Sequence, residues 1–205
     1  MRNLRILLWV LVALALVGAG ALLLRRSVEQ PPQVSAGPVA LGGPFVLTGV
    51  DGRAFSSSTL AGRPYAIFFG FTHCPDVCPT TLARIIRLRR QLGEAGAPLQ
   101  IVFVTVDPER DGPKELKDYL SLFDDPVIGL TGTPPQIDQA KRQFGIYSEK
   151  VPDQAGGYTV DHTATVLLFD REGKFAATIA QGEGDGAALD KLRRIGAPAT
   201  ADNTG

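Results

Sequence analysis

The unbroken apolar run from Tyr65 to Phe71 constrains the fold of this chain more than any other segment. A run of this length without polar alternation is typical of a strand buried on both faces, as in the centre of a parallel sheet. Apolar residues then recur at near-helical spacing and Gly93 follows, which predicts a helix from about Pro79 to Leu92. This strand and helix predict an α/β fold with helices packed on a sheet.

The rest of the chain continues the alternation of strands and helices. Further strands are predicted at Leu99–Val106, Val127–Leu130, Thr163–Phe169 and Phe175–Ile179, and further helices at Pro113–Phe123, Pro134–Phe144 and Ala187–Ile195. Asp51-Gly52, a dipeptide that favours a tight turn, separates two short strands, Phe45–Val50 and Ala54–Phe55. This order predicts a thioredoxin-like sandwich with an N-terminal hairpin extension.

The N-terminal region predicts a membrane anchor. Residues Ile6 to Leu24 are uncharged and almost wholly apolar, enough for a helix to cross roughly 30 Å of hydrocarbon. A cleaved signal peptide is the alternative, with Ala19-Gly20-Ala21 as the small-residue site, but Leu22–Leu24 continue the apolar run beyond it. The predicted divisions are a membrane anchor at 1–26, a proline-containing linker at 27–43, the thioredoxin-like domain at 44–195 and a frayed tail at 196–205.

Charge around the predicted span is nearly balanced, with Arg2 and Arg5 before it and Arg25 and Arg26 after it. The short N-terminal tail is the easier side to leave in the cytoplasm, so the domain is expected to face the periplasm from the cytoplasmic membrane. The formal net charge is +0, and the basic residues are dispersed along the chain. This composition argues against a nucleic-acid-binding protein.

The two cysteines, Cys74 and Cys78, are the only ones in the chain and follow the predicted buried strand directly. Three residues separate them, whereas dithiol oxidoreductases usually carry Cys-x-x-Cys. Each precedes a proline, which places Cys74 on the turn and Cys78 near the helix N-cap, with Pro79 at the first helical position. A helix N-terminus lowers a thiol pKa, and soft thiolates bind copper(I) or zinc. A structural disulfide or two inert buried thiols is the alternative.

The chain has two histidines, His73 and His162, as candidates for an imidazole ligand. If the pleat of the preceding strand continues to Cys74, His73 points to the opposite face, whereas His162 is expected on a loop that folds over the same sheet edge. Asp161 is a candidate acceptor that orients His162. A closed structural zinc site normally takes four Cys or His ligands, so zinc would require every cysteine and histidine of the chain to converge.

A third polar segment, Asp107–Asp111, follows the predicted strand Leu99–Val106. Functional loops of α/β folds lie at this end of the strands. The alternative is a solvated turn whose charges pair with one another.

These three segments resemble the SCO/SenC family of membrane-anchored copper proteins. The match rests on Thr72–Pro79 (THCPDVCP), Val106–Asp111 (VDPERD) and Val160–Thr163 (VDHT), in that order and spacing. The resemblance implies that Cys74, Cys78 and His162 bind copper(I) or copper(II). It further implies that His73 is not a ligand, and that Asp76 and Asp107 shape the site without binding metal.

The resemblance also implies a function. We expect a copper metallochaperone that delivers copper to the CuA centre during cytochrome c oxidase assembly. Its expected partners are the oxidase subunit that carries CuA and another periplasmic copper chaperone or thiol reductant. The main alternative is a periplasmic thiol-disulfide oxidoreductase that keeps the oxidase subunit's cysteines reduced, and a thiol peroxidase is a weaker one.

Overall fold

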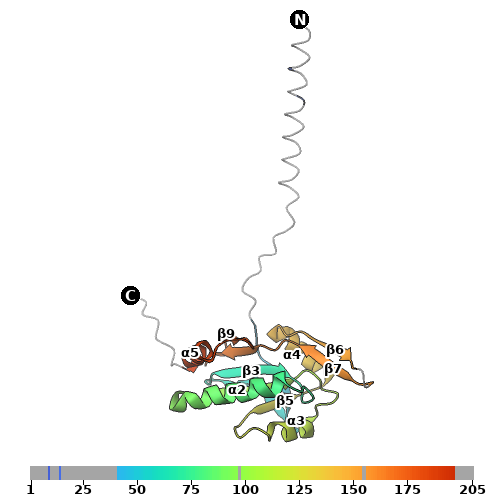
Figure 1. Ribbon diagram of the computed structural model, residues 1–205, viewed down its shortest axis with the longest axis horizontal. Coiled ribbons are helices and arrows are strands. Elements are labelled where there is room, and N and C mark those ends of the chain that lie inside the picture. The colour runs from blue at the N-terminus through green and yellow to red at the C-terminus, as the bar shows by residue number, and fades with distance from the viewer. Residues whose placement is uncertain (1–8, 10–13, 15–40, 97, 154–155, 197–205) are drawn as a thin grey trace. The chain divides into compact units, whose positions relative to one another are not determined.

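The computed structural model describes residues 9, 14, 41–96, 98–153 and 156–196, which form a seven-stranded mixed sheet, a separate two-stranded sheet and flanking helices (Figure 1). The strands are β1 Val46–Gly49, β2 Ala54–Ser56, β3 Tyr65–Gly70, β4 Gln100–Thr105, β5 Ile128–Thr131, β6 Ser148–Pro152, β7 Tyr158–His162, β8 Val166–Phe169 and β9 Phe175–Ile179. The helices are α2 Val77–Gln91, α3 Pro113–Leu120, α4 Pro134–Phe144 and α5 Asp185–Gly196, with short 3-10 turns η1 Ser57–Leu60 and η2 Gly93–Gly96. These elements belong to one compact unit, Ala40–Gly205.

The large sheet has the strand order β2-β1-β5-β4-β3-β8-β9. Strands β3, β4 and β5 are parallel, whereas β1, β8 and β9 each run antiparallel to a neighbour. The predicted N-terminal hairpin forms as β1–β2, and Gly52 in its turn has a φ of +75°, which glycine adopts without steric cost. The arrangement is the predicted thioredoxin-like α/β fold.

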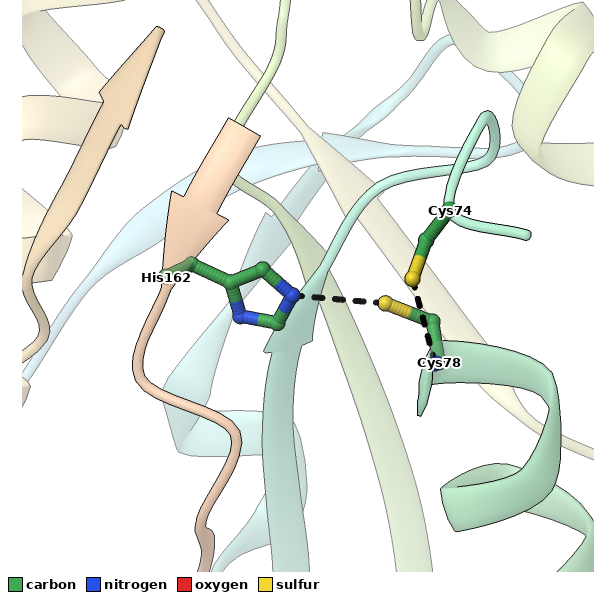
Figure 2. A group of neighbouring side chains, drawn as sticks. All are labelled: Cys74, Cys78 and His162. Carbon is green, nitrogen blue, oxygen red and sulfur yellow. Dashed lines mark hydrogen bonds between the residues drawn. The ribbon is translucent and has the colours of Figure 1, made fainter. Parts of the chain in front are cut away.

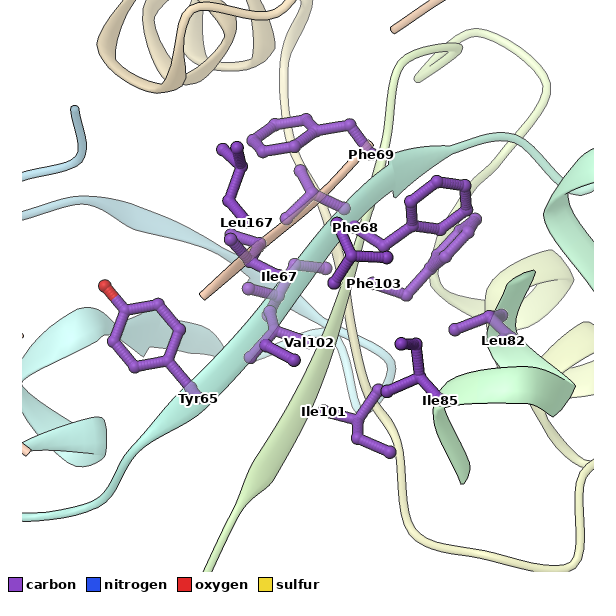
Figure 3. Close-up of a cluster of buried hydrophobic side chains, with 14 of the residues drawn as sticks. Tyr65, Ile67, Phe68, Phe69, Leu82, Ile85, Ile101, Val102, Phe103 and Leu167 are labelled. Atoms are coloured by element: carbon purple, nitrogen blue, oxygen red, sulfur yellow. The ribbon is translucent and has the colours of Figure 1, made fainter. Parts of the chain in front are cut away.

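The apolar strand β3 supplies side chains to both faces of the sheet, and all six of its residues are buried. Phe68 packs against Phe103 of β4, with ring centroids 6.1 Å apart, and both lie on the side of the sheet covered by α2 (Figure 3). Phe69 points to the other side, where its ring lies 5.4 Å from that of Phe144 in α4. Helices on both faces thus explain why the run lacks polar alternation.

Several element boundaries differ from those predicted. Helix α2 begins at Val77 rather than at Pro79, because the first N–H groups of a helix have no intrahelical partner and the first turn tolerates proline. Helix α3 ends at Leu120, and the chain continues to Phe123 in tighter turns. Strand β8 begins at Val166, three residues later than predicted.

The antiparallel pair β6–β7 was not predicted. His162, expected on a loop, is instead the last residue of β7. A signal for β7 is present, since Tyr158 and Val160 alternate with polar residues. Pro152 and the charged residues of β6 obscure the corresponding signal in the partner strand.

Apart from Trp9 and Leu14, the predicted membrane span lies outside the described residues, as do most of the predicted linker and the tail from 197. In the part of the chain that the structure describes, no helix is long and apolar enough to cross a bilayer. The anchor and the domain boundaries therefore stay predictions.

Candidate metal centre

Cys74, Cys78 and His162 converge at the carboxyl end of β3 (Figure 2). Cys74 lies on the turn after β3, Cys78 lies in the first turn of α2, and His162 ends β7. Their sulfur and nitrogen atoms all lie within 4.8 Å of one another. The fold thus brings the imidazole of His162 to two thiols that lie far from it in the sequence.

Hydrogen bonds orient the three side chains toward one another. The backbone N–H of Cys78 donates to Cys74 Sγ at 3.3 Å, and Cys78 Sγ lies 3.4 Å from Nε2 of His162 (Figure 2). Nδ1 of His162 lies 3.1 Å from the Thr163 carbonyl, which only accepts, so Nδ1 carries the proton of the neutral ring. Nε2 then presents its lone pair to the sulfur atoms, as a metal ligand requires.

The prediction that Asp161 orients His162 is wrong. Asp161 is exposed, because successive side chains of β7 alternate between faces and His162 faces inward. The acceptor is instead a backbone carbonyl, that of Thr163. This interaction involves no side chain that a sequence motif could reveal.

Burial is the main influence on the protonation of Cys78 and His162 in the absence of metal. Cys78 is fully buried and Cys74 half-buried, and both are free thiols. Burial raises the pKa of the Cys78 thiol, contrary to the lowering expected at a helix N-terminus, and burial also lowers the pKa of His162. The site therefore holds a neutral thiol at Cys78 and a neutral imidazole, and metal binding would release the thiol proton.

Two sulfur atoms and one imidazole nitrogen form a soft, three-membered donor set. Among the described residues, no further His, Cys, Asp or Glu joins this group. Structural zinc sites normally close with four ligands, whereas thiolates with an imidazole suit copper. The donor set therefore fits copper better than structural zinc.

The SCO1/SenC family model matches residues 33–197. The chain belongs to this family. It is 36% identical over 176 residues to the mitochondrial protein SCO2 of Saccharomyces cerevisiae, covering 82% of this chain and 58% of the yeast protein. The part compared is thus under two thirds of that relative's length.

Two solved structures are similar to this SCO1/SenC protein in both sequence and fold. The structure of ScoI from Bradyrhizobium japonicum is 43% identical with a TM-score of 0.69, and the match covers 76% of this chain and 99% of that one. ScoI from Arabidopsis thaliana is 32% identical with a TM-score of 0.72, covering 76% and 98% respectively. Both are described with copper bound.

Gly70 makes room for the buried cysteine of this SCO1/SenC site. A Cβ atom at Gly70 would lie 2.9 Å from Cys78 Sγ and 2.8 Å from the Phe103 ring, closer than side chains normally approach. No role for Gly70 is predicted from the motifs. A glycine that ends an otherwise bulky buried strand is a signal of close approach that could have indicated one.

The turn that carries Cys74 is held by a buried carboxylate. Asp111 is fully buried and accepts hydrogen bonds from Thr72 N at 2.9 Å, Thr72 Oγ1 at 2.6 Å and Thr105 Oγ1 at 2.7 Å. Asp107 is also fully buried, and it accepts hydrogen bonds from Arg110 and from the Tyr158 hydroxyl. The charges of Asp107 and Arg110 pair within the segment as that alternative expects, but Asp107 and Asp111 are not solvated.

The remaining predicted residues lie around the site without entering the ligand group. Asp76 is exposed at the N-cap of α2 and its side chain makes no capping hydrogen bond, so its shaping role stays a prediction. His73 is exposed, and its Nδ1 lies 3.0 Å from Thr72 Oγ1. The pleat of β3 does not continue to Cys74, because the chain turns at Phe71, whose carbonyl accepts from Cys74 N.

Proposed function

We propose that this SCO1/SenC protein is a copper metallochaperone that binds copper through Cys74, Cys78 and His162. It delivers the ion to the CuA centre during cytochrome c oxidase assembly. The observation that carries the proposal is the convergence of the three ligand atoms within 4.8 Å of one another. The copper bound in the two related ScoI structures supports the choice of metal.

Capture of copper begins with loss of the thiol protons, because thiolates are the metal-binding form of cysteine. The two thiolates and Nε2 of His162 then hold the ion. Three protein ligands leave room for a donor atom of the acceptor, so the acceptor replaces the ligands one at a time in a transient complex. His162 reaches the site from a separate hairpin, whereas both thiolates come from the segment between β3 and α2.

The expected location is the cytoplasmic membrane, with residues 6–24 as a single anchor and the domain in the periplasm. This compartment favours disulfides. Two-electron oxidation by an external oxidant would join Cys74 to Cys78 and release both thiol protons, which removes two copper ligands. The redox state of the pair would therefore control whether the chaperone loads.

The direct test is an anaerobic copper titration of the reduced full-length protein, followed by absorption and electron paramagnetic resonance. We expect one equivalent of copper with sulfur-to-copper charge transfer, and loss or alteration of that signal in Cys74→Ser, Cys78→Ser and His162→Ala. His73→Ala is the matched control, since it removes the other histidine and should leave the spectrum unchanged. Weak binding that is indifferent to all four changes would contradict the proposal.

One observation favours a second function, that of a thiol-disulfide oxidoreductase. Cys74 and Cys78 are both free thiols, and the N–H of Cys78 contacts Cys74 Sγ, so the pair is placed to form a disulfide. Thiol exchange would not need the imidazole, and the His162→Ala variant therefore separates the two functions. Copper transfer to the oxidase subunit fails in this variant if copper is the cargo, whereas reduction of the subunit's cysteines survives if exchange is the function.

A further inference from the structure

The hairpin that carries His162 is not part of the large sheet. Strands β6 and β7 pair with each other in a two-stranded sheet, separate from the seven-stranded sheet of the described residues. Cys74 and Cys78, by contrast, lie on the turn that follows β3 and in the first turn of α2. The distance between the His162 imidazole and the two thiols therefore depends on contacts between the hairpin and the main domain.

The inner face of β7 presents Tyr158, Val160 and His162 to the domain, because every second residue of a strand points the same way. Val160 is buried. Tyr158 lies four residues before His162, which is roughly 13 Å along the strand. A contact that holds Tyr158 thus holds the strand whose end carries the imidazole.

Arg110 holds Tyr158 from two directions. Its Nη1 donates to the Tyr158 carbonyl at 2.9 Å, and its guanidinium carbon lies 3.8 Å from the centroid of the Tyr158 ring, a cation–π distance. Asp107, fully buried, accepts from Nε of Arg110 and from the Tyr158 hydroxyl at 2.9 Å. The three side chains form a closed cycle between the hairpin and the loop after β4.

The same guanidinium also reaches the segment that carries the cysteines. Its carbon lies 5.9 Å from the ring centroid of Phe71, which begins the turn to Cys74. The Phe71 ring in turn stands at 88° to the His162 imidazole, with centroids 5.7 Å apart. Arg110 therefore contacts the hairpin on one side and, through Phe71, the imidazole on the other.

We propose that Arg110, acting with Tyr158 and Asp107, is a positioning residue that clamps the β6–β7 hairpin and keeps His162 at the two cysteines. The inference rests on the proposed function, because it concerns the third copper ligand. Other contacts of the hairpin are weaker candidates. The Lys150–Glu109 ion pair is largely exposed, and exposed pairs stabilise little.

The clamp predicts that Arg110→Gln weakens copper binding although Arg110 touches no ligand atom. Residues that orient metal ligands typically change metal affinity by about 10- to 100-fold when removed, and we expect a loss in this range. Tyr158→Phe keeps the ring and removes the hydroxyl, so a smaller loss is expected. Copper(I) affinity of the reduced full-length protein, measured by competition with a chromophoric chelator, gives these values.

A double-mutant cycle tests whether Arg110 acts through His162. If it does, Arg110→Gln weakens copper(I) binding in the wild-type background and adds little in the His162→Ala background. Copper(II) paramagnetic resonance supplies a second readout, since the nitrogen hyperfine signal of the imidazole should weaken in Arg110→Gln. Arg89→Gln is the matched control, because Arg89 lies near the far end of α2 from Cys78 and binds Asp125 and the Leu99 carbonyl.

The outcomes separate this inference from the proposed function. Equal losses from Arg110→Gln in both backgrounds, or a loss matched by Arg89→Gln, would mean a general effect on the fold and would overturn the clamp. Normal copper affinity in Arg110→Gln, with a loss in His162→Ala, would also overturn it and leave the chaperone proposal intact. Absence of copper binding by the wild-type protein would contradict the proposed function itself.

Discussion

Gly70 and Cys78 meet where β3 ends, and the absent side chain of one leaves space for the sulfur of the other. Gly70→Ala would place a methyl group against both Cys78 Sγ and the Phe103 ring. Overpacking of a core typically costs about 1–3 kcal/mol, and we expect a loss of this size in the free energy of unfolding.

Copper affinity of Gly70→Ala should fall as well, because Cys78 Sγ must move. Urea unfolding and chelator competition measure the two effects. Gly62→Ala serves as a control for substitution of a glycine, since an added Cβ would meet nothing within 4 Å there and only the φ of +76° would strain the alanine. Copper affinity unchanged in Gly70→Ala would contradict the role assigned to Gly70.

Tyr119 carries a buried hydroxyl that has no hydrogen-bond partner among the described residues. Its ring packs against Phe103 with centroids 5.6 Å apart, and burial raises the pKa of the phenol. A buried unsatisfied polar group costs about 1–3 kcal/mol. Tyr119→Phe is therefore expected to increase the free energy of unfolding by about 1 kcal/mol.

Urea denaturation measures this gain, and Tyr158→Phe is its matched comparison. The Tyr158 hydroxyl has a partner in Asp107, so its removal should lower stability. A loss of stability in Tyr119→Phe would mean that the hydroxyl is satisfied, for example by a buried water molecule.

At the scale of elements, the turn between β3 and α2 is fastened to β4 by Asp111. Asp111→Ala would remove the acceptor of three hydrogen bonds, one from the backbone and two from threonine hydroxyls. We expect a loss of about 3 kcal/mol in the free energy of unfolding, since buried hydrogen bonds to a charged group are lost together.

Weaker copper binding should accompany this loss, because the turn carries Cys74. Asp118→Ala on α3 is the control: its carboxylate is largely exposed and pairs with the exposed Lys114, so little change in stability is expected. Equal stability losses in the two variants would refute the assignment of Asp111 as the fastening group.

At the scale of the whole molecule, Arg84 joins α2 to α5 and to the loop before it. It donates to Asp185 at 2.8 Å and to the carbonyls of Ala180 and Glu183. Hydrogen bonds from Arg84 and Arg87 hold the pKa of Asp185 below its usual value. A depressed carboxyl pKa contributes stability above the unfolded pKa of about 3.9, and this stability is lost as the pH falls through the folded value.

Arg84→Gln is therefore expected to lower the free energy of unfolding at neutral pH. On acidification, the variant should lose less of this free energy than the wild type loses. The difference between the two proteins should shrink as the pH falls below about 4, without vanishing, because the carbonyl contacts do not titrate. Unfolding measured from pH 7 to pH 3 gives this comparison. A difference in the free energy of unfolding that stays constant over this range would contradict the role assigned to the Asp185 carboxylate.

Much of the fold followed from local pattern. Burial on a strand or helix face imposes a period that neighbouring residues share, and this period predicted β3 and α2. Turn and cap residues predicted two further elements, the hairpin at Asp51-Gly52 and the proline-initiated α4. The identity of the three candidate ligands also came from sequence, since the chain offers few soft donors and their motifs match a known family.

Tertiary structure decided the rest, because it depends on residues distant in sequence. Only the folded chain places His162 beside Cys78, gives the Thr163 carbonyl the role expected of Asp161, and buries Asp107 and Asp111. Burial also reversed the expected direction of the Cys78 pKa. Desolvation and side-chain contact arise from packing in three dimensions, and no spacing along a single chain records which distant groups will supply them.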